Sequence, residues 1–233
     1  TSSGGWTFYI PITFAKSLRI EADNLNYWHV GYEMFAPDVK LESFTMDSDY
    51  SEAVEMLEQT GNLNHLYENS KIIEKTNLSV GDSNDVCEIA NIEGANRIYA
   101  IEINIPELKE LMAGEDYNSN RAKALIRNLR IQAYWDNEKF PGVDAPIGEF
   151  FASNRFSVVK VESLALGLRE DGTLYCYFPM PFKKAGKIVL YANGDVNTGN
   201  ISSKVLYEEF EGPWEYTGYF KTQENHTLPA KQG

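Results

Sequence analysis

The sequence predicts an all-β protein made of two tandem jelly-roll β-sandwiches, of which the first copy is incomplete. Three observations predict this fold. Short segments of alternating apolar and polar residues recur along the chain, separated by turn-forming residues. Few stretches show the spacing of an amphipathic helix. Two sequence blocks near the N-terminus also return, in the same order, in the second half of the chain.

The repeated blocks indicate an internal duplication. Residues 9–20 align with residues 177–188 through identical Tyr, Pro, Phe, Lys and Ile. Residues 30–35 align with residues 205–210 through identical Val, Tyr, Glu and Phe. A longer loop at residues 194–200, rich in turn formers, accounts for the greater length of the second copy. A repeat of this size indicates two domains of one fold, because the units of solenoid proteins are much shorter.

The duplication also sets the predicted domain boundaries. We assign residues 1–90 to the C-terminal part of the first jelly roll with its connection, and residues 91–233 to the second jelly roll. Strands between residues 97 and 168 precede the repeated blocks in the second copy, whereas only eight residues precede Tyr9. A sandwich without such strands exposes open edges and an apolar face. We therefore expect an upstream segment or a companion chain to supply them.

The first part of the chain is predicted to hold strands and one helix. Residues 7–23 and 27–35 have the alternation of strands, and residues 49–59 have the spacing of a helix that Gly61 ends. The Asn- and Gly-rich residues 61–96 are predicted to connect the two copies and to add a strand or two.

The second half is predicted to be rich in strands. Residues 96–105 alternate as far as Pro106, residues 107–112 suit a short helical turn, and residues 125–135 form another strong strand. Further strands are expected at residues 145–152, 158–168, 174–178, 186–191, 204–210 and 215–222.

Composition and charge exclude several classes of function. The formal net charge is −13 and the pI is about 4.7, so we expect neither nucleic-acid binding nor docking on an anionic membrane. The chain has no run of 18 apolar residues of the kind that spans a membrane. Three scattered His and two Cys without a CxxC pair predict no metal site and no cofactor. Whether Cys87 and Cys176 pair stays open.

Three motifs carry a family resemblance. Residues 135–151 read W-D-N-E-K-F-P-G-V-D-A-P-I-G-E-F-F and are similar to the pattern W-D-G-E-x-x-P-S-V-x-x-P-L-G-D-F-F. Residues 175–182 resemble its downstream partner, an aromatic run that closes in P-M-P-F, and residues 9–20 resemble an earlier copy of that block. Together the motifs resemble glycoside hydrolase family 172.

The resemblance implies a double jelly roll, a cyclic homo-oligomer such as a trimer or hexamer, and retaining hydrolysis of fructofuranosides or arabinofuranosides. It also implies a glycan substrate and further sequence upstream. Asn137 replaces a glycine of the pattern, Glu149 replaces its aspartate, and Ala152 replaces the glycine that usually follows the pattern. These changes leave open a different substrate or a branch without hydrolase activity. A secreted or periplasmic protein is expected, with a cytoplasmic one as the alternative.

The candidate catalytic residues are two glutamates. A retaining glycosidase needs two carboxyl groups about 5–5.5 Å apart, one as nucleophile and one as proton donor. Glu149 lies between Gly148 and two aromatic residues, and Glu170 precedes the Asp171-Gly172 turn. The acids Asp136, Glu138 and Asp144 are reserves for these catalytic roles. The candidate substrate-binding residues are Trp135, Asp136, Asp144, Phe151, Tyr175, Trp28 and His29.

Each candidate also has a purely structural interpretation. The aromatic residues suit a hydrophobic core, the acids near Pro141-Gly142 suit a turn, and Glu170 suits a solvated turn. A non-catalytic sugar-binding jelly roll and a structural shell protein are therefore the alternatives to a furanoside hydrolase or transglycosylase, since jelly rolls host many functions.

Overall fold

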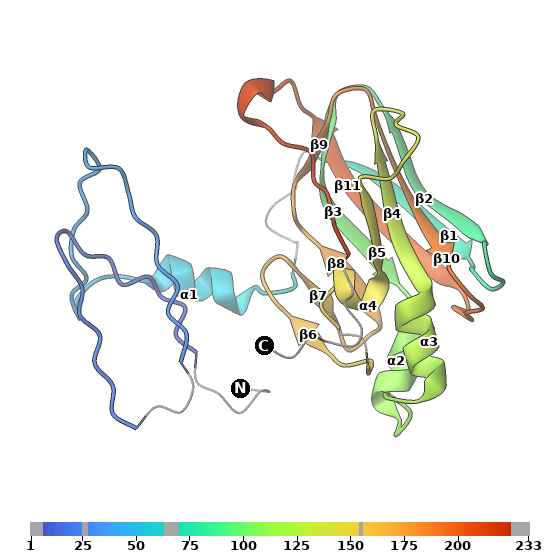
Figure 1. Ribbon diagram of the computed structural model, residues 1–233, viewed down its shortest axis with the longest axis horizontal. Coiled ribbons are helices and arrows are strands. Elements are labelled where there is room, and N and C mark those ends of the chain that lie inside the picture. The colour runs from blue at the N-terminus through green and yellow to red at the C-terminus, as the bar shows by residue number, and fades with distance from the viewer. Residues whose placement is uncertain (1–6, 25–27, 63–69, 154–155, 225–233) are drawn as a thin grey trace, which may run out of the picture. The chain divides into compact units, whose positions relative to one another are not determined.

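The computed structural model describes residues 7–24, 28–62, 70–153 and 156–224 of the 233-residue chain. The chain divides into two compact units, Thr1–Glu58 (unit 1) and Gln59–Gly233 (unit 2). Figure 1 shows the strands gathered in unit 2 and the helix α1 in unit 1.

Unit 2 is a sandwich of two β-sheets. The two sheets hold seven and four strands. The seven-stranded sheet contains β1 (Lys71–Leu78), β11 (Ile201–Glu209), β3 (Asn96–Asn104), β8 (Thr173–Cys176), β7 (Leu166–Leu168) and β6 (Val161–Glu162) in that order, with β9 (Met180–Phe182) also beside β3. The four-stranded sheet contains β2 (Val86–Glu93), β10 (Ala185–Ala192), β4 (Leu129–Trp135) and β5 (Val143–Pro146).

The strand pairs of unit 2 are nested, and this nesting defines the topology. β1 pairs with β11, β2 with β10, β3 with β8 and β9, and β4 with β5, always antiparallel. Successive pairs alternate between the two sheets, so the chain folds as one long two-stranded ribbon wrapped on itself. This is the topology of a jelly roll, and the predicted all-β sandwich class is confirmed.

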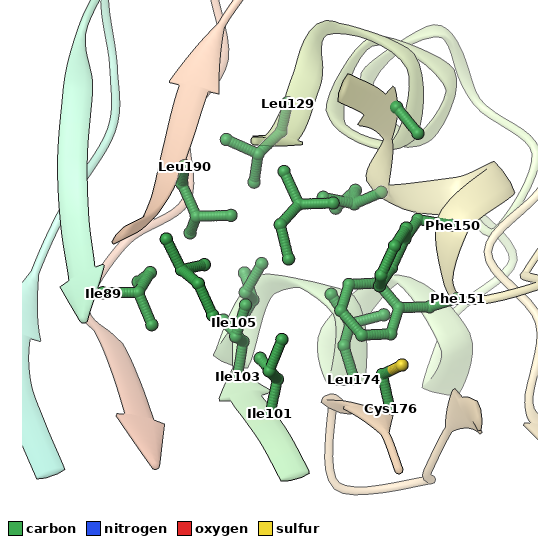
Figure 2. Close-up of a cluster of buried hydrophobic side chains, with 14 of the residues drawn as sticks. Ile89, Ile101, Ile103, Ile105, Leu129, Phe150, Phe151, Leu174, Cys176 and Leu190 are labelled. Atoms are coloured by element: carbon green, nitrogen blue, oxygen red, sulfur yellow. The ribbon is translucent and has the colours of Figure 1, made fainter. Parts of the chain in front are cut away.

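The hydrophobic core lies between the two sheets. Residues of β4 alternate between buried and half-buried positions, as expected for a strand with one face on a core. Figure 2 shows Ile89, Ile103 and Leu190, from three different strands, pointing into one apolar interior. Burying each such side chain contributes about 1.5–3 kcal/mol.

The two cysteines of unit 2 are buried and free rather than paired. Burial raises the pKa of the Cys176 thiol to about 11.

Two strands lie within residues 61–96, the segment that the sequence analysis treats as the connection between the copies. Strands β1 and β2, which the sequence analysis placed in that connection, pair with β11 and β10 inside unit 2. Unit 2 therefore takes in residues well before residue 91, and the division of the chain falls between Glu58 and Gln59.

Helices cover one end of the sandwich, where Figure 1 shows α2 (Pro106–Ala113) and α3 (Asn120–Asn128). The predicted helical turn at residues 107–112 is confirmed as α2, but the strand predicted from residue 125 begins only at Leu129. Ala122, Leu125 and Ile126 share one buried helical face, and Ser119 caps the helix by accepting a hydrogen bond from the Ala122 backbone (3.1 Å).

Two other predicted strands need correction. Residues 145–152 end the strand β5 and then form the one-turn helix α4 (Ile147–Phe150). Residues 215–222 form no strand, and the 3₁₀ turn η1 (Trp214–Tyr216) stands at their start. Residues 158–168 form two short strands, β6 and β7, with a tight turn between them.

Unit 1 forms the predicted helix but not the predicted strands. Helix α1 (Ser51–Glu58) follows Asp49, whose carboxylate accepts a hydrogen bond from the Ser51 backbone (2.9 Å). Within residues 7–24 and 28–50 the structure has no strand, so the strands predicted at residues 7–23 and 27–35 are not formed there. A strand needs a hydrogen-bonded neighbour, and these residues have none of the ladder partners that unit 2 provides.

No helix in the described part of the chain is long and apolar enough to cross a membrane.

Candidate active site

A pocket of about 490 Å³ lies in unit 2 at the end of the sandwich that carries the helices. Its lining combines apolar side chains with two lysines, a tyrosine and one acid. The lining residues are Lys109, Met112, Ala113, Tyr117, Val158, Val159, Lys160 and Glu170. The volume falls in the range of small-molecule sites.

The turn between β7 and β8 places Glu170 on the wall of this pocket. The turn is closed by hydrogen bonds from the Arg169 backbone to Thr173 (2.9 Å) and from the Gly172 backbone to Arg169 (3.1 Å). Gly172 has φ +85° and lies against the start of α2, where a Cβ atom would come within 2.6 Å of the Ile105 carbonyl oxygen. A glycine is therefore needed at this position to bring the turn beside α2.

Lys160 joins two carboxylates at the pocket. Its ammonium lies 3.0 Å from an oxygen of Glu170 and 3.3 Å from an oxygen of Glu162. Because both oxygens contact one nitrogen, they cannot lie farther apart than these two distances combined. The hydrogen bond to Glu170 is the main cause of the raised pKa of Lys160, and the hydrogen bond to Glu162 adds to it. Loss of hydration has the opposite, smaller effect on this pKa.

Glu149 lies on helix α4, between the buried residues Gly148 and Phe150, and its own side chain is half-buried. It is not among the described residues that line the pocket. The structure therefore brings Glu170, but not Glu149, to that pocket within a single copy of unit 2.

The three aromatic candidates of unit 2 belong to the core. Trp135 is 1% exposed and stacks on Phe182 with ring centroids 5.8 Å apart, while its indole donates to the Phe220 carbonyl (2.8 Å). Phe151 and Tyr175 are both 0% exposed. In this structure all three rings therefore pack inside the core of unit 2 and present no exposed face.

Asp136 holds a turn rather than facing the pocket. Its Oδ1 atom accepts hydrogen bonds from the backbones of Lys183 (2.8 Å) and Lys184 (2.7 Å), and its Oδ2 atom accepts one from the Tyr219 hydroxyl. Burial by itself would raise the pKa of this carboxyl, but these hydrogen bonds outweigh it and hold the pKa below its usual value. Asp136 thereby joins the end of β4 to the β9–β10 turn.

Asp144 also makes structural contacts. Its carboxylate pairs with Arg130 (2.6 Å), and its backbone donates to the Thr222 hydroxyl (3.0 Å). Arg130 pairs in turn with Glu224 (2.8 Å). This network fixes the C-terminal segment along the edge strand β5. The reserve acid Glu138 is exposed in the β4–β5 turn.

The two remaining candidates, Trp28 and His29, lie in unit 1. Trp28 is 74% exposed, and His29 is exposed as well.

Comparisons with known proteins assign the family. A family model described as "GH172 domain-like" matches residues 69–205, more than half of the chain. A second model, "GH172 first beta-sandwich domain", matches residues 1–52. The chain belongs to glycoside hydrolase family 172.

Other comparisons add little to this family assignment. No curated protein matches the chain by sequence. The chain is similar to a solved structure titled "Crystal Structure of the STIV MCP", with 12% sequence identity, a TM-score of 0.23 and 60% of the chain covered. The chain spans about half (49%) of the length of that protein.

The structure explains two departures from the family 172 pattern. Asn137 has φ +63° and Ala152 has φ +58°, so both stand where the backbone is left-handed and the pattern has glycine. Asn adopts this conformation readily, whereas the Cβ atom of Ala makes it costly. Asn137 therefore keeps the left-handed backbone after β4 at little cost. Ala152 keeps the left-handed backbone after α4 with some strain.

One polar cluster was missed by the sequence analysis. The Arg169 guanidinium pairs with Glu102 (2.6 Å) and donates to the Gly61 carbonyl (2.6 and 2.9 Å), and the Tyr177 hydroxyl donates to Glu102 (2.9 Å). Burial, followed by the charge of Glu102, strongly raises the pKa of Tyr177. The cluster fixes the base of the turn that carries Glu170. A sequence signal existed: Glu102 is the one acid in the Ile-rich segment 101–105.

Proposed function

We propose that the chain carries catalytic residues of a retaining glycoside hydrolase, or transglycosylase, that acts on furanosides such as fructofuranosides or arabinofuranosides. The observation that carries this proposal is the family match over residues 69–205, which includes both Glu149 and Glu170. The position of Glu170 on the wall of a ligand-sized pocket supports it.

The lining of the pocket suits a sugar ring. Met112, Ala113 and Val158 offer apolar surface to the CH groups of a ring, while Tyr117 and Lys109 can hydrogen-bond to its hydroxyls. A net charge of −13 on the whole chain does not oppose a neutral glycan.

A retaining mechanism needs a second carboxyl group about 5–5.5 Å from that of Glu170. We propose that Glu149 supplies it when copies of the chain assemble into a cyclic homo-oligomer, so that the glutamates of neighbouring copies face one substrate. The alternative within the same proposal is that substrate binding brings the two glutamates of one copy together.

The test measures release of 4-nitrophenol from 4-nitrophenyl arabinofuranosides and fructofuranosides. Glu149→Gln and Glu170→Gln should each lower kcat at least about 1,000-fold, because each removes one of two catalytic carboxyls. Azide should restore turnover in the variant that lacks the nucleophile and should give a glycosyl azide. The matched control is Glu74→Gln, an exposed glutamate of β1 outside the pocket, which should keep full activity.

Mixing the two inactive variants distinguishes the two arrangements. If neighbouring copies share a site, mixed oligomers contain some sites with both glutamates, and part of the activity returns. If one copy supplies both glutamates, the mixture stays inactive.

The second candidate function is non-catalytic sugar binding or a structural role. It is favoured by the position of Glu149 outside the pocket and by the pairing of Glu170 with Lys160. It predicts either saturable glycan binding without cleavage or no binding. This second function would be supported if neither the arabinofuranosides nor the fructofuranosides of the test were cleaved.

A further inference from the structure

The pocket of unit 2 is a basic spot on an acidic chain. Its lining carries two lysines, Lys109 and Lys160, and one acid, Glu170. At physiological ionic strength, exposed charges more than about 8 Å apart are largely screened from each other. A ligand in the pocket is therefore subject to the local lysines rather than to the net charge of −13 on the whole chain.

Helix α2 forms one wall of the pocket and places Lys109 on it. Lys109, Met112 and Ala113 all line the pocket, and their spacing of three and four residues puts them on one face of the helix. The turn that carries Glu170 packs against the same helix, because a Cβ atom on Gly172 would lie 3.3 Å from the Lys109 Cβ atom. Lys109 and Glu170 therefore lie on neighbouring walls of one pocket.

The segment 158–160 forms a further wall. The Val158 backbone donates a hydrogen bond to the Tyr117 carbonyl (2.6 Å), which fixes this segment to the loop after α2. Val158 is buried, whereas the Tyr117 side chain is exposed. The pocket thus combines a buried apolar residue with an aromatic side chain that a ligand can reach.

The two lysines differ in their carboxylate partners. The Lys160 ammonium is shared between Glu170 (3.0 Å) and Glu162 (3.3 Å), so two carboxylates already neutralise it. Lys109 makes no ion pair with any residue of the described ranges 7–24, 28–62, 70–153 and 156–224.

The acids of helix α2 do not neutralise Lys109. Glu107 is buried and pairs with Arg121 of α3 (2.5 Å). Glu110 follows Lys109 directly, and adjacent residues of a helix do not face each other. The Lys109 ammonium is therefore available to a ligand in the pocket.

We propose that the pocket binds a furanose that carries an anionic group, a phosphate or a carboxylate, and that Lys109 selects this group. The ring packs against Met112 and Val158, and the anionic group accepts hydrogen bonds from the Lys109 ammonium, a compact cation with three N–H donors. The inference rests on the proposed function for the furanose ring, and it adds the substrate class, a furanoside with a charged substituent.

Isothermal titration calorimetry of the purified chain tests the charge preference with three compounds that share one ring. The ring is that of 2,5-anhydromannitol, a fructofuranose without an anomeric hydroxyl, so no turnover disturbs the measurement. Its 1-phosphate and the corresponding carboxylate, 2,5-anhydromannonate, are the anionic compounds. At least one of these two should bind at least about 10-fold more tightly than 2,5-anhydromannitol, because hydrogen bonds between charged groups are the strong ones.

The same titrations identify the anionic group. Tight binding of the phosphate alone assigns a phosphorylated furanoside, tight binding of the carboxylate alone assigns a furanoside acid, and tight binding of both supports an anionic group of either kind. Equal affinity for all three compounds would overturn the proposal. Inorganic phosphate that binds as tightly as the sugar phosphate would overturn it as well, because the pocket would then hold an adventitious ion only.

Variants of one lysine test the role of Lys109. Lys109→Met should weaken binding of the preferred anionic compound at least about 10-fold and leave the affinity for 2,5-anhydromannitol unchanged. Lys109→Arg keeps the charge and should keep the preference. The matched control Lys184→Met removes an exposed lysine outside the pocket lining and should change neither affinity. A Lys109→Met chain that keeps the preference would contradict the role of this lysine.

The binding test and the hydrolase test can fail separately. A charge preference without cleavage of any nitrophenyl furanoside would support the anionic ligand and contradict the hydrolase. Cleavage without a charge preference would support the hydrolase and contradict the anionic ligand.

Discussion

Units 1 and 2 contain similar sequence blocks in very different surroundings. In unit 2, Phe182 is 0% exposed and stacks on Trp135 of β4, and Gly186 leaves room for its ring, because a Cβ atom there would lie 2.6 Å from the ring. In unit 1 the counterpart Phe14 is only half-buried, and Leu18 stands where unit 2 has that glycine. Strands from elsewhere in the fold, rather than the block itself, therefore decide whether the apolar side chains of the block are buried.

The turns inside the first block differ in the same way. In unit 2 the backbones of Lys183 and Lys184 donate to Asp136, which follows the neighbouring strand β4. In unit 1 the corresponding residue Ala15 donates instead to the nearby Ser43 hydroxyl (3.2 Å). A carboxylate from an adjacent strand thus fixes one turn, and a local hydroxyl holds the other.

The largest expected difference in stability between the units comes from replacing Phe182 and its counterpart Phe14 by alanine. Phe182→Ala should lower the free energy of unfolding of unit 2 by about 3–5 kcal/mol, because it opens a cavity beside Trp135. Phe14→Ala should change that value by no more than about 0.5 kcal/mol. Urea unfolding followed by tryptophan fluorescence checks both. Equal losses in the two variants would show that the units fold as one body.

The next effect concerns the turn anchor. Asp136→Asn should destabilise unit 2 by about 2 kcal/mol, because a charged acceptor of backbone hydrogen bonds is replaced by a neutral amide. Ser43→Ala in unit 1 removes the local counterpart and should leave the unfolding of unit 2 unchanged. Urea unfolding at neutral pH measures the difference.

The pH dependence of Asp136 gives a second measurement. Its pKa is lower in the folded state than in the unfolded state, so its carboxylate stabilises the fold fully above the unfolded value of about 3.9. This contribution is lost as the pH falls through the lower, folded pKa. The Asn variant should therefore lose less stability than the parent between pH 5 and pH 2, and an identical acid profile would contradict the role assigned to Asp136.

The alternation of apolar and polar residues predicted most strands of unit 2. These strands alternate because only one face of each strand packs on the core. It placed strands β3, β10 and β11 with small boundary errors. It failed at α3, where Leu125 and Ile126 suit a strand as well as a helix, and the cap at Ser119 decided for the helix. It also failed in unit 1, where alternation is present but hydrogen-bonded neighbours are not.

The candidate site was less predictable than the fold. The sequence identified Glu170, which does line the pocket, but could not show that Lys160 and Glu162 would gather around it across the β6–β7 turn. It also offered Trp135 and Tyr175 as sugar-stacking residues, although both are core residues. An aromatic residue on a strand has the same local pattern whether its face meets a ligand or another sheet, so only tertiary packing distinguishes the two.

A smaller effect is expected from the two tyrosines that open the repeated blocks. Tyr177→Phe removes a hydroxyl that donates to Glu102 (2.9 Å) and should lower the free energy of unfolding by about 1 kcal/mol. The loss is small because Arg169 still pairs with Glu102. Its counterpart Tyr9 is 73% exposed, and Tyr9→Phe should have no measurable effect. Thermal unfolding compares the two variants. A loss in Tyr9→Phe equal to that in Tyr177→Phe would mean that unit 1 buries this residue as unit 2 does.

The smallest effect comes from residues with a left-handed backbone. Ala152→Gly should stabilise unit 2 by about 0.5–1 kcal/mol, because relief of strain at φ +58° exceeds the added flexibility of glycine in the unfolded chain. Asn137→Gly, at φ +63°, should be close to neutral, because Asn tolerates this conformation. Asn24→Gly, at φ +56° in unit 1, serves as the control that should leave the unfolding of unit 2 unchanged. Destabilisation by Ala152→Gly would mean that the Ala152 methyl group contributes packing that outweighs the strain of its backbone.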